Sequence, residues 1–411
     1  MEAKVCVGLM SGTSMDGIDA NLLKTDGETV VQSLASAFYP YSNSFKFLLK
    51  SAEELIYQCK GDFSKACGLW INPDVHTLDS ELISLLEICN LNSISLENLI
   101  FLSTYLHHKA VIDLCDSQNY SPDNIEVIGY HGQTLYHAPQ QKKSLQLGNS
   151  QWLANQLKRP VAADFRSNDI NAGGQGAPLA PLYHWALCTQ TGIMPTAILN
   201  CGGIANITLI PNENPEELIA FDTGPGNVLL DRFVRYKTDQ SFFYDYGGHW
   251  GMAGIVDHFA LEKLFEESLS YNFLEKIPPK SLDSHDCKLP EFILQLSLQN
   301  GCATLAAFSA ELMVRSLSFF PIIPTYWVLA GGGWYNAAIL MQFKERLESR
   351  LKKSPQIFTA SQLGWENDMI EAQAFAYLAK RVLKKLPISF PKTTGVKKPL
   401  TGGKIFYPEN D

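Results

Sequence analysis

The stretch VGLMSGTSMDGIDA, residues 7–20, decides what fold the rest of the chain can build. An apolar run ends in small and hydroxyl-bearing residues at 11–14, and a second apolar run resumes after Asp16 and Asp19. This pattern predicts a strand, a tight turn and a second strand. Backbone N–H groups in such a bare turn can surround a phosphate, and the carboxylates could hold a magnesium ion or its waters. An ordinary hairpin turn is the alternative.

Two later segments repeat this arrangement of an apolar strand that runs into glycines. The sequence AILNCGGIANITLI at 197–210 predicts a second strand, turn and strand. A buried strand at 326–330 runs into three glycines at 331–333, and Asn336 then opens a helix. Two hairpins that each face a phosphate chain, with a third glycine turn against a base and ribose, are typical of actin-like ATPase domains. Strands alternate with helices, so each half is expected to be α/β.

The predicted fold class is therefore α/β, with two actin-like (ribonuclease H-like) domains and a nucleotide cleft between them. We expect the first domain to span 1–160, with a return of the chain over 386–411, and the second to span 161–385. Apolar periodicity predicts one long helix over 290–319. The Pro-, Gly- and Lys-rich tail 387–411 reads as a surface extension.

Composition narrows the class of protein. The chain has 411 residues, 46% of them hydrophobic and 18% charged, which suits a large globular core. A formal charge of −9 disfavours a nucleic-acid role. Nine cysteines form no CxxC pair, which favours buried thiols in a reducing compartment over a zinc site. Neither a signal-peptide pattern nor a run of 18 apolar residues is seen, so we expect a cytoplasmic protein without a membrane partner.

Asp222 is the candidate catalytic carboxylate. It ends a short strand (LIAFD) and is followed by TGPGN, which opens a helix. The glycines of that turn leave room for a substrate hydroxyl, and a helix N-terminus favours an anion. A general base needs only to reach the proton that it takes. An Asp before a helix is also a common N-cap, and that interpretation stays open.

Polar side chains at two further strand ends are candidates for substrate binding. His131 and Gln133 follow a buried strand, where α/β proteins place ligands. Arg166, Asp169 and Gln175 lie around three glycines in the next loop, where Arg suits a carboxylate and Asp and Gln suit sugar hydroxyls. A structural histidine and an Asp–Arg pair that pins the loop are the alternatives.

Together these motifs resemble one family, the anhydro-N-acetylmuramic acid kinases of the actin-like sugar kinase and Hsp70 superfamily. The segments that carry the resemblance are GLMSGTSMDGIDA (8–20), GYHGQTLYHAP (129–139), LQLGN (145–149), VAADFRSNDINAGGQGAPLAP (161–181), LNCGGIANIT (199–208), FDTGPGNVLLD (221–231) and VLAGGGWYN (328–336). They occur in the family's order and span most of the chain.

The resemblance implies an ATP-dependent enzyme. It would open the 1,6-anhydro bridge of anhydro-N-acetylmuramic acid with water and phosphorylate the freed 6-oxygen, which yields N-acetylmuramic acid 6-phosphate in cell-wall sugar recycling. ATP and Mg²⁺ would be the cofactors, and Asp222 would be the general base for the attacking water. The residues implied for the nucleotide are Gly12, Thr13, Ser14, Met15, Asp16, Gly17, Ile18 and Asp19 at the phosphates, Gly202 and Gly203 at a second phosphate turn, and Gly331, Gly332, Gly333 and Asn336 at the adenosine.

Two segments depart from the family pattern. The family often carries PKSTGRE where this chain has PKSLDSH at 279–285, and a basic DFRRRD where it has DFRSND at 164–169. A shifted sugar preference is therefore open, and residues 58–78 have no predicted role. The alternatives are an actin-like kinase for another sugar and a non-catalytic nucleotide-binding regulator. The sequence leaves the oligomeric state open, a homodimer included.

Overall fold

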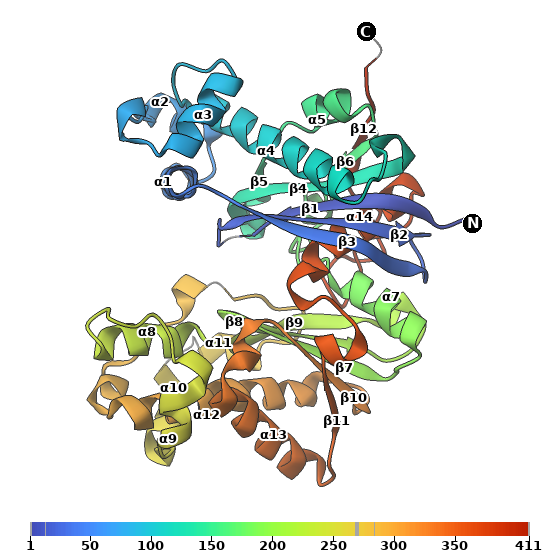
Figure 1. Cartoon of the computed structure of the whole chain (residues 1–411). Coiled ribbons are helices and arrows are strands. Elements are labelled where there is room, and N and C mark those ends of the chain that lie inside the picture. Colours follow the sequence, from blue (N-terminus) through green and yellow to red (C-terminus); the bar gives the residue numbers. More distant parts are fainter. Residues whose placement is uncertain (1, 13, 268–270, 283, 410–411) are drawn as a thin grey trace. The chain divides into compact units, whose positions relative to one another are not determined.

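The chain forms two compact units, which are built from different parts of the sequence (Figure 1). Unit 1 comprises residues 1–190 and 369–411, and unit 2 comprises residues 191–368. The computed structural model describes residues 2–12, 14–267, 271–282 and 284–409.

Unit 1 is an α/β unit in which helices cover a seven-stranded sheet. Its strands are β1 (Lys4–Ser11), β2 (Gly17–Thr25), β3 (Val31–Pro40), β4 (Ile125–Ala138), β5 (Lys143–Leu147), β6 (Val161–Ala163) and β12 (Lys404–Phe406). Its helices are α1 (Asn43–Gln58), α2 (Phe63–Leu69), α3 (Ser80–Ile88), α4 (Leu96–Ser117), α5 (Ser150–Leu157), α6 (Ser167–Asn171), α7 (Pro181–Thr191) and α14 (Ile370–Leu383).

The strands of this sheet follow the order β12-β6-β4-β1-β2-β3, and β5 pairs with β4. The strands β1, β2 and β3 are antiparallel, whereas β4 lies parallel to β1 and β6 parallel to β4. Two glycines let the helix α14 approach the sheet closely. A Cβ at Gly8 would lie 1.8 Å from the carbonyl oxygen of Ala372, and one at Gly129 would lie 2.1 Å from that of Phe375.

Unit 2 contains a five-stranded sheet with its own hydrophobic core. Its strands are β7 (Thr196–Cys201), β8 (Ile204–Ile210), β9 (Ile219–Pro225), β10 (Tyr326–Ala330) and β11 (Gln356–Thr359). Its helices are α8 (Val228–Lys237), α9 (His249–Ala253), α10 (His258–Glu267), α11 (Tyr271–Glu275), α12 (Leu298–Arg315) and α13 (Ala337–Leu351).

The unit 2 sheet repeats the topology of the unit 1 sheet. Its order is β11-β10-β7-β8-β9, with β7, β8 and β9 antiparallel and with β10 and β11 parallel to β7. In both units, three antiparallel strands joined in sequence are followed by two parallel strands that are reached through helices. This repeated order is that of the actin-like (ribonuclease H-like) fold, and it confirms the predicted α/β class.

The boundaries of the two units differ from the expected ones at 160/161 and 385/386. The strand β6 follows residue 160, yet it pairs with β4 and β12 in the first sheet, so the chain stays in unit 1 through α7. The helix α14 packs on β1, β2 and β4, so the return begins near residue 369. Backbone pairing and helix packing set these boundaries, and composition does not reveal either.

The tail is also more ordered than predicted. Ile388, Phe390 and Val396 are each only 2% exposed, and β12 pairs with β6. Residues 387–409 are therefore part of the packed unit 1 rather than a surface extension. The predicted helix over 290–319 is shorter, because Ser297 caps a helix that begins at Leu298, and only short 3₁₀ turns flank it.

The region 58–78, for which no role is predicted from the sequence, holds α2 and a 3₁₀ turn. By length and apolar content alone, one segment of the described chain, Leu298–Phe319, could span a membrane. Since 72% of its most apolar 18-residue stretch is buried in unit 2, it has the surroundings of a core helix. All nine cysteines lie within the described residues, where none forms a disulfide; seven are buried, as predicted, and Cys67 and Cys89 are half-buried.

Candidate functional site

The turn between β1 and β2 in unit 1 is tied down by a side chain from β4. Gln133 donates from Nε2 to the carbonyl oxygen of Gly12 over 2.9 Å, and the N–H of Met15 donates to the same oxygen over 3.1 Å. Ser14 donates from Oγ to Asp16 over 2.6 Å. Gln133 is fully buried, so it braces the turn rather than presenting its amide to solvent. Its predicted contact with a sugar stays a prediction.

The residues implied at the phosphates have different roles. Met15 and Ile18 bury their side chains in the unit 1 core, so only their backbone can face a ligand. Gly17 is needed for packing, because a Cβ there would lie 2.4 Å from a carbonyl oxygen of β3. Asp16 is exposed and Asp19 half-buried. Thr13 lies outside the described residues.

The second turn, at Gly202 and Gly203 between β7 and β8, is braced by the start of α8. The carbonyl oxygen of Gly203 accepts from the N–H of Gly226 over 2.9 Å, and that of Gly202 accepts from the N–H of Asn227 over 2.9 Å. A Cβ at either turn glycine would lie at least 3.6 Å from its nearest neighbour in the described chain. The turn is therefore fixed in position and still has room at its surface.

The three glycines after β10 divide into two kinds. A Cβ at Gly331 would lie 2.4 Å from Asn200, and one at Gly333 would lie 2.4 Å from Cys201, so both are required for packing against β7. Gly331 also has a φ of +90°, which favours glycine. A Cβ at Gly332 would meet no atom of the described residues within 4 Å. Of the three, Gly332 has the room that a bound nucleotide would need.

Asn336 begins the helix after the third turn, as the sequence predicted, and its implied contact with adenosine stays a prediction. Its Oδ1 accepts from the N–H groups of Ala338 over 3.0 Å and Ile339 over 3.1 Å, which makes it the N-cap of α13. A cap of this kind satisfies N–H groups that the helix itself leaves without partners. Asn336 therefore places the helix after the third turn, and its side-chain oxygen is already occupied.

Asp222 lies inside β9, opposite Asn206 of β8. The segment 280–282 holds it from both sides: its N–H donates to the carbonyl oxygen of Lys280 over 3.0 Å, and its Oδ2 accepts from the N–H of Leu282 over 2.8 Å. The helix that follows is capped at Asn227, five residues later, so Asp222 is not the N-cap that the sequence left open.

The surroundings of Asp222 favour a base that works near neutral pH. Burial raises the pKa of its carboxyl from 3.8 to about 6, although the Leu282 N–H and the charge of Lys280 pull it downward. A carboxylate with a pKa near 6 is ionised at neutral pH and still binds a proton well. Among the described residues, no hydrogen bond occupies its Oδ1. This oxygen is available to accept a proton from a reacting molecule.

In unit 1, the buried His131 and the half-buried Arg166 form a hydrogen-bonded pair. Arg166 donates to Nε2 of His131 from Nε over 3.1 Å and from Nη2 over 2.9 Å, and it donates from Nη1 to the Gly176 carbonyl oxygen over 2.7 Å. The other ring nitrogen, Nδ1, lies 2.7 Å from the carbonyl oxygen of Gly132, so the proton is assigned to Nδ1. Burial and the Arg166 charge hold the pKa of His131 well below its usual value, so the ring is neutral.

Asp169 pins the glycine-rich loop through Gly176 and Thr394, and not through the Asp–Arg pair that was the alternative from the sequence. Its Oδ1 accepts from the N–H of Gly176 over 2.6 Å, and its Oδ2 accepts from the hydroxyl of Thr394 over 2.5 Å. The backbone N–H of Gln175 donates to the Thr394 carbonyl oxygen over 2.7 Å, and the Gln175 side chain is half-buried. Asp169 is only 1% exposed, so its predicted contact with a sugar hydroxyl finds no support here.

The residues that hold Asp222 and the loop were not among those predicted from the sequence. Lys280 and Leu282 lie in the segment that departs from the family pattern, and their link to Asp222 spans 58 to 60 residues. Thr394 lies in the tail that was expected to be a surface extension. The retained Pro-Lys-Ser of the first segment was the available signal, whereas nothing in the sequence marked Thr394.

The described residues contain no group of three or more His, Cys, Asp or Glu that could hold a metal ion. Mg²⁺ in nucleotide sites does not need such a group, because it is bound through one or two carboxylates, waters and the substrate phosphates. Asp16 and Asp19, beside the first phosphate turn, are a donor set of that kind. The residues present therefore fit a magnesium ion that arrives with a nucleotide.

Two units of the same strand order, each with a bare turn after its first strand, make the chain a two-domain actin-like α/β protein. Solved structures resemble it only distantly: the (R)-2-hydroxyglutaryl-CoA dehydratase component A of Acidaminococcus fermentans matches over 93% of this chain and 100% of that chain, with 9% identity and a TM-score of 0.43.

Similarity of sequence identifies the family of the chain, which the distant structural likeness does not. The family model described as anhydro-N-acetylmuramic acid kinase matches residues 4–60 and 71–408. The anhydro-N-acetylmuramic acid kinase of Zymomonas mobilis is 40% identical over 98% of this chain and 100% of its own length. That of Azorhizobium caulinodans is 39% identical over 98% of this chain and 99% of its own. The chain belongs to the anhydro-N-acetylmuramic acid kinase family.

Proposed function

We propose that this chain hydrolyses the 1,6-anhydro bridge of anhydro-N-acetylmuramic acid and phosphorylates the freed 6-oxygen with ATP. The observation that carries the proposal is Asp222, a half-buried carboxylate with a pKa raised to about 6 and an oxygen available to a reacting molecule. The products are N-acetylmuramic acid 6-phosphate and ADP. Family membership supports the choice of sugar.

In the proposed reaction, Asp222 takes a proton from a water molecule that attacks the anomeric carbon. A C–O bond forms there, and the bond between the anomeric carbon and the 6-oxygen breaks. The 6-oxygen forms a bond to the γ-phosphorus of ATP while the bond from that phosphorus to the β–γ bridging oxygen breaks and ADP leaves. The charge that develops on the 6-oxygen is therefore neutralised by phosphorus instead of by a proton. Glycoside cleavage ordinarily needs an acid at the leaving oxygen, and here phosphoryl transfer replaces that acid.

The nucleotide would be bound by backbone rather than by side chains. The turn at Gly12, braced by Gln133, and the turn at Gly202 and Gly203, braced by α8, present backbone to the phosphates. Gly332 would allow the adenosine to lie flat against the third turn. Asp16 and Asp19 would hold Mg²⁺ or its waters, and the ion would offset the charge of the phosphates.

The sugar would be recognised through the His131–Arg166 pair in unit 1. The Arg166 guanidinium is a fork that suits the lactyl carboxylate of the muramic acid. Because His131 is neutral, it leaves the positive charge of the pair on Arg166. Gln175 is half-buried beside this pair and could reach a sugar hydroxyl. Since ATP is the phosphoryl donor, we propose a cytoplasmic reaction.

The test is the mass of the product formed from anhydro-N-acetylmuramic acid, ATP and Mg²⁺ in ¹⁸O-labelled water. The proposed reaction adds one water and one phosphoryl group, with the solvent oxygen on the anomeric carbon. A kinase that acts on a plain hydroxyl would give a phosphorylated product that keeps its anhydro ring and lacks the solvent oxygen. A regulator that only binds nucleotide would give no product. Asp222→Asn is the matched control.

A further inference from the structure

The segment that holds Asp222 is itself anchored by one buried side chain. The ammonium group of Lys280 donates to the carbonyl oxygens of Phe273 over 3.1 Å and Leu274 over 3.2 Å. Lys280 is only 5% exposed. A lysine is rarely buried to this degree, since desolvating its charge costs several kcal/mol unless partners compensate. Its burial therefore has to be compensated by partners within the protein, and not by solvent.

Aromatic rings form the rest of the site around this ammonium group. Its nitrogen lies 4.6 Å from the ring centre of Phe319, 4.7 Å from that of Phe273 and 5.8 Å from that of Phe221. The faces of aromatic rings attract a cation, and more strongly where water is excluded. Phe221 is the residue directly before Asp222, so the ammonium also contacts the strand that carries the base.

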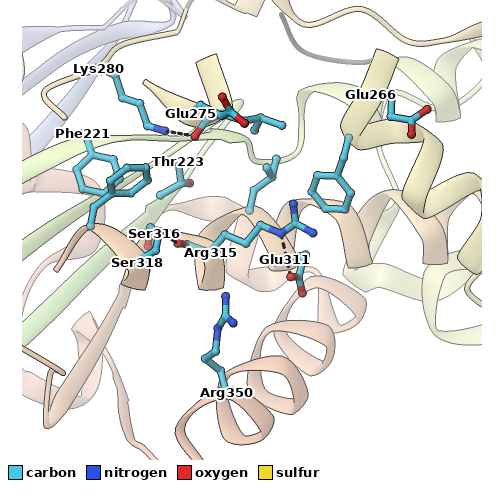
Figure 2. Close-up of a pocket in the computed structure, with 14 residues that line it drawn as sticks. Phe221, Thr223, Glu266, Glu275, Lys280, Glu311, Arg315, Ser316, Ser318 and Arg350 are labelled. Atoms are coloured by element: carbon cyan, nitrogen blue, oxygen red, sulfur yellow. Dashed lines mark hydrogen bonds and ion pairs between the residues drawn. The ribbon is translucent and has the colours of Figure 1, made fainter. Parts of the chain in front are cut away.

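A cavity of about 660 Å³ opens beside Lys280, between β9 and α12 (Figure 2). Phe221 and Thr223 line it, whereas Asp222 is not among the described residues of its lining. Its charged lining comprises Lys280, Arg315, Arg350, Glu266, Glu275 and Glu311. With three cations and three carboxylates, the cavity favours no one class of charged ligand. The cavity itself therefore carries no proposal, but one residue of its lining, Lys280, is connected to Asp222.

That connection runs through the backbone. The carbonyl oxygen of Lys280 accepts the N–H of Asp222, and two residues later the N–H of Leu282 donates to the Asp222 carboxylate. We infer that Lys280 is a positioning residue: by fixing the segment 280–282 against Phe273 and Leu274, it holds the Leu282 N–H on Asp222 and so sets the orientation and basicity of the base. This inference rests on the proposed function of Asp222.

The electrostatics agree with this geometry. The positive charge of Lys280 lowers the pKa of Asp222, and burial lowers the pKa of Lys280 itself to about 8. The other charged groups that act on Lys280 are Lys276, which lowers its pKa, and Asp222, which raises it. Glu275, Glu311 and Arg315 line the same cavity as Lys280, and Glu275 lies beside it (Figure 2). Loss of the Lys280 charge and of the Leu282 hydrogen bond would each raise the pKa of Asp222.

The test uses Lys280→Met, which keeps an unbranched chain among the rings and removes the charge and the donors. We expect kcat to fall between about tenfold and 100-fold, as a misplaced catalytic group does, with the KM for ATP little changed. The acidic limb of the kcat profile should move to higher pH. Lys276→Met removes an exposed charge four residues away and should leave kcat and the acidic limb of its pH profile unchanged. A fall in kcat with an unmoved acidic limb would show a merely structural role and overturn the inference.

A second measurement does not depend on turnover. The difference in unfolding free energy between the chain that keeps Asp222 and its Asp222→Asn variant, followed against pH, reports the pKa of Asp222. Its midpoint should lie at higher pH in the Lys280→Met background than with Lys280 intact, and an unchanged midpoint would overturn the inference. If the chain lacks the proposed activity, this midpoint is still measurable, so the two failures are distinguishable. Should Lys280→Met not fold, Lys280→Gln, which keeps an amide donor, is measured in the same way.

Discussion

Replacing Asp222 by Asn should make the protein a much poorer enzyme and a more stable one. Asn keeps the shape of the side chain and can still accept the Leu282 N–H, but it cannot take up a proton. Loss of a general base lowers turnover by about 10² to 10⁴. Since the phosphate turns are untouched, affinity for ATP should stay near that of the wild type.

The gain in stability follows from the raised pKa of Asp222. The pKa rises from 3.8 in the unfolded chain to about 6 in the folded one, so the folded state binds more protons between these values. Stability from this group therefore falls as pH rises from about 4 to about 6, and it stays low at higher pH. A shift of about two pKa units corresponds to about 3 kcal/mol. Asp222→Asn removes this penalty, so the variant should be more stable above pH 6 by up to that amount.

Two assays check this prediction. Urea unfolding of both proteins at pH 4 and pH 7.5 should give nearly equal free energies at the lower pH and a more stable variant at the higher one. The kcat of the wild type should rise with pH and reach half its plateau near pH 6. Variant turnover within about tenfold of wild type, or a variant less stable at pH 7.5, would refute the reasoning.

Three further predictions concern the turns and the loop. Gly332→Val should raise the KM for ATP and leave the melting temperature unchanged, whereas Gly333→Val should lower the melting temperature, because its side chain would collide with β7. Gln133→Leu should remove one of the two donors to the Gly12 carbonyl oxygen, at a cost of about 0.5–1.5 kcal/mol, and weaken the binding of an ATP analogue in calorimetry; unchanged affinity would argue against the brace. Asp169→Asn should lower the unfolding free energy by about 1–3 kcal/mol, since one of two accepted hydrogen bonds is lost, and an unchanged value would contradict the pinning role.

The repeated fold was accessible from the sequence because its signals are local. An apolar run, a few small residues and a second apolar run specify a hairpin wherever they occur, as residues 7–20 and 197–210 do. The unit boundaries were not accessible in this way. Whether Val161 continues the first sheet or begins the second depends on which strand it pairs with, and its partners Ile128 and Phe406 lie far along the chain in opposite directions.

The glycine turns show which features of the site could not be predicted from the sequence. All three glycines at 331–333 look alike in the sequence, yet Gly331 and Gly333 serve packing against β7 and Gly332 has open space. Asn336 was expected both to open a helix and to lie at the adenosine, and the structure shows that its side-chain oxygen caps α13. A motif predicts which residues lie near a ligand, but only the structure shows which of them already pack against or hydrogen-bond to other parts of the protein.

Asp169 and Asp222 show the same difference between a residue held by the protein and a residue available to a ligand. Both are aspartates beside glycine-rich turns, and the sequence presents both as site candidates. Asp169 accepts hydrogen bonds on both oxygens from Gly176 and Thr394, so its charge is committed to holding the loop. Asp222 accepts one backbone N–H on a single oxygen, and burial raises its pKa to about 6. A base must be incompletely satisfied before it reacts, and that condition, rather than residue type, is what separates the catalytic candidate from the structural one.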